Sequence, residues 1–246
     1  FEVTTVTDAN KAEMEKAISS FTKKVRPGDA ALFYFSGHGV RSENVNYLIP
    51  LEAEIQVAAE YPAKAVSAQG VLEKLDLAKS RVSIIILDAC RQIQDRAPTL
   101  SRNKSDSGGL AQMKASRGTL SAYATAPGKT ASDGLGRNSA FTEHLLREMK
   151  DPKLPIEDVF KRTRTKVHEA TNNRQTPWEN SSLEGADFCL SDPCIRPVSP
   201  IGPPAPDDMN PDVNTIGMEL RVIPPGKVLD EQHRLIVSPQ VFLMSA

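Results

Sequence analysis

Two residues whose types can do covalent chemistry each follow an apolar run. His38 stands between glycines after AALFYFS (30–36), and Cys90 follows VSIIIL (82–87) and Asp88. A thiol is a modest nucleophile until it is ionised, and a nearby imidazole can accept its proton. If the two runs are neighbouring parallel strands, both residues lie at the carboxyl edge of the sheet, where open α/β sheets bind their ligands. The spacing therefore predicts a cysteine–histidine site.

Taken singly, Cys90 and His38 could each have a structural role instead of a catalytic one. A lone buried cysteine usually packs, and a lone histidine is usually a satisfied polar residue. Their shared position at strand ends beside sharp turns favours a catalytic pair. The chain has only three cysteines, which is too few for a disulfide framework and fits no zinc pattern. Cys189 and Cys194 could bridge in an exported protein, although two separate structural thiols are the more frequent arrangement.

The elements that must position this pair alternate along the chain. Buried apolar runs that alternate with helix-like segments predict a mostly parallel sheet with helices on both faces, an α/β fold. The polar stretch 91–118 is expected to be a long loop. Strands are expected at 1–6, 30–36, 46–50, 82–87, 119–126 and 184–190, and helices at 12–21, 67–79, 139–149 and 156–170. Ser67 and Ser139 are expected to cap two of these helices.

The amino-acid composition argues against nucleic-acid binding and against a membrane protein. The 246 residues carry a net charge of −1, which offers no electrostatic attraction for nucleic acid or a membrane surface. No apolar run approaches the roughly 20 residues that cross a bilayer. The partner expected from the site is a protein or peptide substrate, while a homodimer, a regulatory domain and the cellular location stay open.

Two short motifs resemble the signature blocks of the caspase, metacaspase and paracaspase clan. SGHG (36–39) and DACR (88–91) correspond to its histidine and cysteine motifs. The caspase cysteine motif is Q-A-C-[RQG]-G with the histidine about 50 residues upstream, and here the two residues are 52 apart. The segments AYATAPG (122–128) and GRNSAFTEHLL (136–146) resemble bacterial members of the clan. The resemblance implies a caspase-like α/β/α sandwich.

The resemblance also implies roles and boundaries. Cys90 would be the nucleophile, His38 the acid and base, and the N–H groups of Gly39 and Cys90 the oxyanion hole. The peptidase domain would cover 1–190, without the strand and helix that normally precede the segment matching Phe1. A linker rich in proline and aspartate would follow over 191–214, and then a C-terminal extension, in part β, over 215–246.

Substrate preference is expected from acidic residues. Animal caspases have Gln where this chain has Asp88, whereas metacaspases and paracaspases have Asp and cleave after Arg or Lys. A carboxylate attracts a guanidinium and repels an acidic side chain. Asp133 would contribute to the same pocket. The alternative for Asp88 is a turn-capping role. No paired aspartates lie between His38 and Cys90, so neither calcium nor another cofactor is expected.

An enzyme with basic specificity could cut its own 91–118 loop, which contains several arginines and lysines. Two other functions use the same fold: a catalytically silent scaffold or signalling module, and a different thiol chemistry such as acyl transfer. An intact His38, Gly39 and Cys90 argue against the scaffold, which would not need them.

Overall fold

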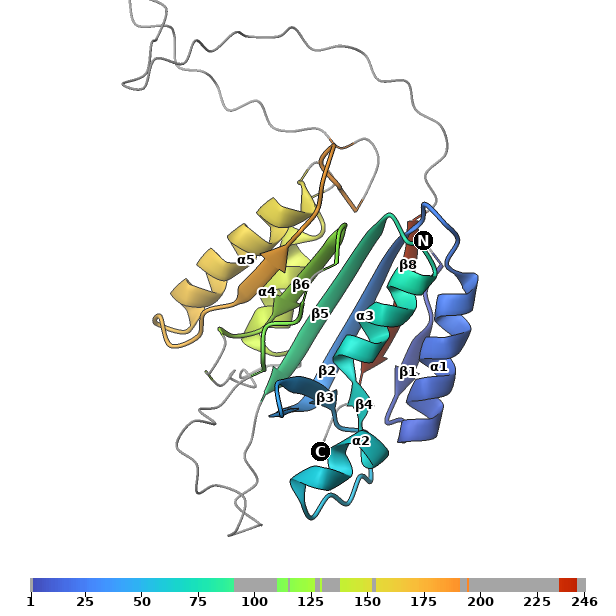
Figure 1. Ribbon diagram of the computed structural model, residues 1–246. Helices are drawn as coiled ribbons and strands as arrows, with labels where there is room; N and C mark the ends of the chain where they lie inside the picture. Colours follow the sequence, from blue (N-terminus) through green and yellow to red (C-terminus); the bar gives the residue numbers. More distant parts are fainter. Residues whose placement is uncertain are drawn as a thin grey trace, which may run out of the picture.

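The computed structural model describes residues 2–90, 110–114, 116–126, 129, 138–151, 154–190, 194 and 235–242; at Cys90 and over 235–242 the description is of the backbone. Within these ranges the chain forms a central sheet between two layers of helices (Figure 1). The predicted α/β fold is thereby confirmed.

Six strands form the main sheet in the order β1-β8-β2-β5-β6-β7. Every neighbouring pair is parallel except β6 and β7, which are antiparallel, so the sheet is mixed. Strand β8 comes from the segment expected as a C-terminal extension, and it lies between β1 and β2. The bounds are β1 Thr5–Thr7, β8 Leu235–Phe242, β2 Ala30–Ser42, β5 Val82–Cys90, β6 Thr119–Tyr123 and β7 Trp178–Ser181.

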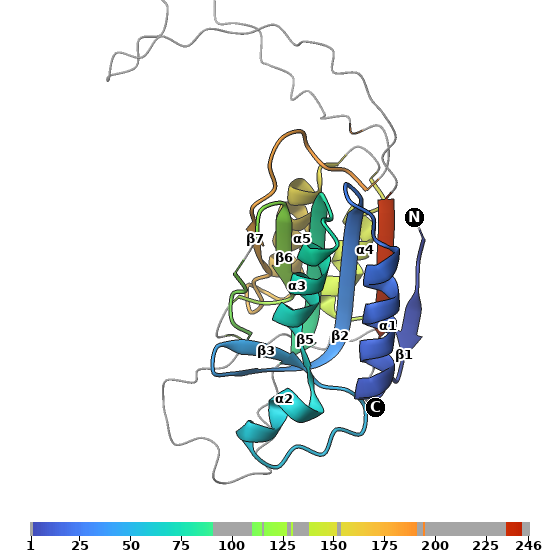
Figure 2. The ribbon, with the colours of Figure 1, turned by 45° about the vertical axis from the view of Figure 1, so that its right-hand side comes forward.

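Helices cover both faces of this sheet, as Figures 1 and 2 show. Helices α1 (Lys11–Lys24) and α3 (Ala68–Leu77) lie on one face, and α4 (Ala140–Glu148) and α5 (Ile156–Ala170) lie on the other. Helices α1, α3 and α4 each begin with a side-chain cap, whereas α5 follows Pro155. Asn10 forms a capping box with Glu13 at α1, and the Ser67 hydroxyl accepts a hydrogen bond from the N–H of Gly70 at α3.

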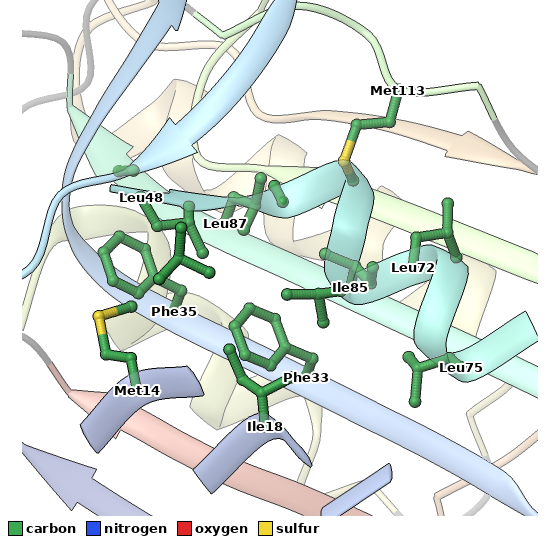
Figure 3. Close-up of a cluster of buried hydrophobic side chains, with 14 of the residues drawn as sticks. Met14, Ile18, Phe33, Phe35, Leu48, Leu72, Leu75, Ile85, Leu87 and Met113 are labelled. Carbon is green, nitrogen blue, oxygen red and sulfur yellow. The ribbon is translucent and has the colours of Figure 1, made fainter. Parts of the chain in front are cut away.

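Strands β2 and β5 are apolar on both faces because each face packs against a different pair of helices. On β5, Ile85 and Leu87 join the cluster beneath α1 and α3, whereas Ile84 and Ile86 join the cluster beneath α4 and α5. Figure 3 shows the first cluster, in which side chains from α1, α3, β2 and β5 interdigitate. The alternation of side chains along a strand therefore sorts one continuous apolar run into two cores.

A small hairpin extends β2 beyond its predicted end. Residues 39–42 pair antiparallel with β3 (Val45–Leu48), and β3 pairs with β4 (Val66–Ser67). A 3-10 turn (Ala58–Glu60) and the short helix α2 (Tyr61–Lys64) connect β3 to β4.

Two expectations for the C-terminal part of the domain are wrong. The sheet ends on β7, whereas 184–190 contains only an isolated bridge between Pro155 and Cys189. Cys189 and Cys194 are joined in a disulfide and are not separate thiols. In the described ranges, no helix combines the length and apolar character that crossing a membrane requires.

Candidate active site

The parallel ladder between β2 and β5 keeps an unbroken register up to its carboxyl end. Ser36 pairs with Asp88, and two residues later His38 pairs with Cys90. Neighbouring strands are roughly 4.8 Å apart. Strand alternation also assigns positions 36, 38, 88 and 90 to the face that carries α4 and α5. The predicted meeting of the histidine and cysteine positions at one sheet edge is thus present in the backbone.

The hairpin to β3 holds the histidine segment. The carbonyl of His38 accepts a hydrogen bond from the N–H of Ile49 at 2.9 Å. Gly39, which pairs with Leu48, is therefore a non-hydrogen-bonded position of the antiparallel ladder, and its N–H points away from β3. His38 itself is half-buried.

Gly39 packs too closely against its neighbours to carry a side chain. A Cβ added at this position would lie 2.9 Å from the Cβ of Ala89 and 3.2 Å from Cδ2 of Leu110. The contact with Ala89, next to Cys90 on β5, keeps the backbones of the two strand ends together. A glycine is thus required here by close approach.

Asp88 is buried, with 5% of its surface exposed, and is surrounded by hydroxyl groups. Ser139 and Thr142, from the first turn of α4, each donate to Oδ2 of Asp88 at 2.5 Å. The Tyr34 hydroxyl lies 3.4 Å from the same oxygen and 2.6 Å from the Thr142 hydroxyl. Sequence reasoning identified Asp88 and expected Ser139 to cap a helix, but it did not identify this cluster.

The pKa of Tyr34 reflects the electrostatics of the cluster around Asp88. Burial, and then the negative charge of Asp88, raise the pKa of this phenol well above its ordinary value. Tyr34 therefore stays protonated, and its hydroxyl remains a hydrogen-bond donor at any physiological pH.

A second polar anchor lies near Gly39. The side-chain amide of Asn46 donates to the carbonyl of Ala111 at 2.6 Å and accepts from its N–H at 2.7 Å. The N–H of Met113 donates to the hydroxyl of Tyr123 at 2.9 Å, a phenol whose pKa burial raises to about 12. These contacts hold Leu110 against Gly39, and no sequence motif indicated them.

Other predicted features lie elsewhere. Asp133 falls outside the described residues. Within the described chain, no group of three or more His, Cys, Asp or Glu side chains is placed to hold a metal ion. A surface pocket between α1, α3 and β3, bordered by Lys11, Tyr47 and Lys74, does not include the strand ends that carry His38 and Asp88.

Comparison with known proteins assigns the family. The family model of the caspase domain matches residues 1–188, which supports a function of the cysteine-peptidase type. No curated protein matches the chain. Among solved structures, that of pro-sf-caspase-1 is similar at 16% identity, with a TM-score of 0.47, over 72% of this chain and 71% of that chain. This structural likeness is too weak to add to the argument.

Proposed function

Because the chain belongs to the caspase domain family, we propose that it is a cysteine endopeptidase that cleaves after Arg or Lys. Cys90 is the nucleophile, and His38 is the general base and acid. The observation that carries the proposal is the register pair of His38 with Cys90 at the carboxyl end of the β2–β5 ladder. An imidazole and a thiol on adjacent strands can span the interstrand distance, as nucleophilic catalysis requires.

The reaction proceeds through an acyl-enzyme. The Cys90 sulfur attacks the scissile carbonyl carbon while His38 takes the thiol proton, and a tetrahedral intermediate forms. His38 returns the proton to the leaving amine, the C–N bond breaks, and a thioester remains. A water molecule then attacks the thioester carbonyl as His38 takes one of its protons. The second intermediate collapses, releasing the new carboxyl end, and the proton returns to the Cys90 thiolate.

The oxyanion formed in each step needs donors that are already in position. We assign this role to the N–H groups of Gly39 and Cys90. The direction of the Gly39 N–H away from β3 supports the assignment, as does its close packing against Ala89.

Basic specificity is proposed from Asp88. Its register pair with Ser36 lies two positions before the pair of His38 with Cys90, and so on the same face. A buried carboxylate with little water around it attracts a guanidinium strongly and repels an acidic side chain. Asp133 is proposed as a second acidic contributor.

Self-processing is proposed for the segment between β5 and β6. Residues 110–114 are held by Asn46 and by Tyr123, and 116–119 by the carbonyl of Ser182, which accepts from the N–H of Gly118. Cleavage is therefore expected upstream of this anchored stretch, after the basic residues Arg96, Arg102 or Lys104. Mass spectrometry of active protein should show this cut, and the Cys90→Ala protein should stay intact. Identical intact masses after long incubation would contradict self-processing while leaving peptidase activity untouched.

The test of the proposed function is a fluorogenic peptide library varied only at the residue before the cut. Wild type should prefer Arg and Lys and should cleave after Asp poorly. Leaving one charge of a buried pair without its partner typically costs 2–5 kcal/mol, so Asp88→Asn should lower kcat/KM for basic peptides by roughly 30-fold to several thousand-fold.

Two controls distinguish an altered specificity pocket from a missing nucleophile and from a catalytically silent scaffold. Alkylation of Cys90 by iodoacetamide should proceed at a similar rate in wild type and Asp88→Asn, because only the pocket is altered. An arginyl electrophilic probe should label wild type and not Cys90→Ala. If wild type prefers Asp, or if Asp88→Asn keeps the Arg preference, the assignment of Asp88 to the specificity pocket is wrong. If wild type shows neither labelling nor turnover, a catalytically silent scaffold is favoured.

A further inference from the structure

The hydroxyl cluster around Asp88 has a defined direction of hydrogen bonding. An ionised carboxylate only accepts, and each hydroxyl has one proton to donate. Ser139 and Thr142 each direct their proton to Oδ2 of Asp88. The Tyr34 proton then goes to the nearer acceptor, the Thr142 oxygen at 2.6 Å. Two hydroxyl protons are thus donated to Oδ2 of Asp88, and the Tyr34 proton is donated to the oxygen of Thr142.

This arrangement stabilises the charge of Asp88 without neutralising it. Hydrogen bonds donated to a carboxylate favour its charged form, and hydroxyls bring dipoles but no positive charge. The first turn of α4 adds the favourable end of a helix dipole. Hence these donors hold the carboxylate in its charged form, which is the form that attracts a cationic side chain.

We propose that Ser139 and Thr142 are positioning residues for substrate specificity, which hold the Asp88 carboxylate charged and in one orientation at the sheet edge. The inference rests on the proposed recognition of Arg or Lys by Asp88. It assigns the start of α4 a role in the pocket as well as in the fold, with Tyr34 supporting Thr142 from β2.

Thr142 is the better residue to test, because Ser139 also caps α4 by accepting a hydrogen bond from the N–H of Thr142. Thr142→Val keeps the side-chain shape and removes the hydroxyl. Thr142→Ser keeps the hydroxyl and is the matched control. The substrates are two peptides identical except for Arg or its neutral isostere citrulline before the cut.

Wild type should favour the Arg peptide in kcat/KM. Loss of one hydrogen bond to a charged group should lower the Arg-to-citrulline ratio about tenfold in Thr142→Val. The change should appear mainly in KM, since binding is weakened equally in ground and transition states. Thr142→Ser should stay within about twofold of wild type, since it retains the donor.

Binding measurements make the test independent of turnover. In a Cys90→Ala background, fluorescence anisotropy gives the dissociation constants of the same two peptides, and their ratio should change in the same way. Should Thr142→Val fail to fold, Tyr34→Phe removes the supporting hydroxyl and should lower the ratio about threefold.

The outcomes distinguish the inference from the function on which it rests. If wild type prefers Arg and the folded Thr142→Val protein keeps the whole preference, the hydroxyls only fasten α4 to the sheet and the inference is wrong. If wild type does not distinguish Arg from citrulline in either assay, basic specificity fails and the inference fails with it. A tenfold loss in Thr142→Val that Thr142→Ser restores supports both.

Discussion

The two faces of the β2–β5 pair differ most at their carboxyl ends. Beneath α1 and α3 the strands stay apolar to the end, with Phe35, Leu87 and Ala89 buried. Toward α4 and α5 the same strands become polar at Ser36 and Asp88, next to the His38–Cys90 pair. Alternation lets two strands fix their register through one face and present chemistry on the other. The apolar face beneath α1 and α3 therefore fixes the positions of the strands, and the face toward α4 and α5 carries the reactive residues.

The apolar face is closed over its end by residues from outside the two strands. Figure 3 shows Leu48 of β3 beside Leu87 and Phe35, and Met113 above α3. The polar face is closed by the first turn of α4, whose hydroxyls bind Asp88. Substitutions on the two faces should consequently change different quantities, stability on one and chemistry on the other.

The largest effect is expected from the reactive pair. Cys90→Ala should reduce peptide cleavage to background because no nucleophile remains, and His38→Ala should reduce it by about 10²–10⁴-fold through loss of acid–base catalysis. Fluorogenic turnover measured beside circular dichroism checks this, and both proteins should remain folded. The double variant Cys189→Ala/Cys194→Ala is the control for the other two cysteines, which form a disulfide, and it should keep near-wild-type turnover. Normal turnover by folded Cys90→Ala would disprove the assignment.

On the apolar face the effect should fall on stability. Leu87 is fully buried, and Leu87→Ala should lower the free energy of unfolding by about 2–5 kcal/mol through lost burial and a cavity. Urea denaturation followed by circular dichroism measures it. Leu77→Ala, at a residue that is 82% exposed on α3, should change it by no more than about 0.5 kcal/mol. Equal losses at the two leucines would contradict the described core.

Gly39 lies on the apolar face and directly follows His38, so its substitution should affect both stability and turnover. Gly39→Ala places a Cβ against that of Ala89, and overpacking of this kind costs about 1–3 kcal/mol. Turnover should fall as well, since the oxyanion donor shifts. The double variant Gly39→Ala/Ala89→Gly removes the clash and should recover part of the stability and activity. No recovery in thermal melts and kinetics would mean that the contact with Ala89 is not the cause.

At the Asn46 anchor the effect should be confined to stability and to one segment, without a loss of catalytic groups. Asn46→Ala leaves the N–H and C=O of Ala111 without this partner in a buried setting, which should destabilise the protein by about 1–3 kcal/mol. Residues 110–113 should also become more sensitive to limited proteolysis. Gln112→Ala, at an exposed position in the same stretch, should leave melting temperature and proteolysis unchanged. A similar digest for both variants would show that Asn46 does not hold the segment.

Much of this architecture could be predicted because its signals are local. Helix α5 coincides with the predicted 156–170, and Ser67 and Ser139 cap helices as expected. Apolar runs located β2 and β5, although β2 continues through SGHGVRS because β3 pairs with it. Strand β7 was missed, because WENS is a short, polar edge strand with no apolar alternation.

By itself the sequence determined the α/β class, the main helices and the placement of His38 and Cys90 directly after two buried apolar runs, because periodicity and capping act within a few residues. Only the tertiary structure decided that β8 lies between β1 and β2, that Cys189 bridges to Cys194, and that the hydroxyls of α4 converge on Asp88. The strand order and the hydroxyl cluster join residues far apart in the chain, whereas the disulfide spans only five positions and depends on how the chain turns after Cys189. Their partners depend on how whole elements pack, and no local pattern of residues encodes that choice.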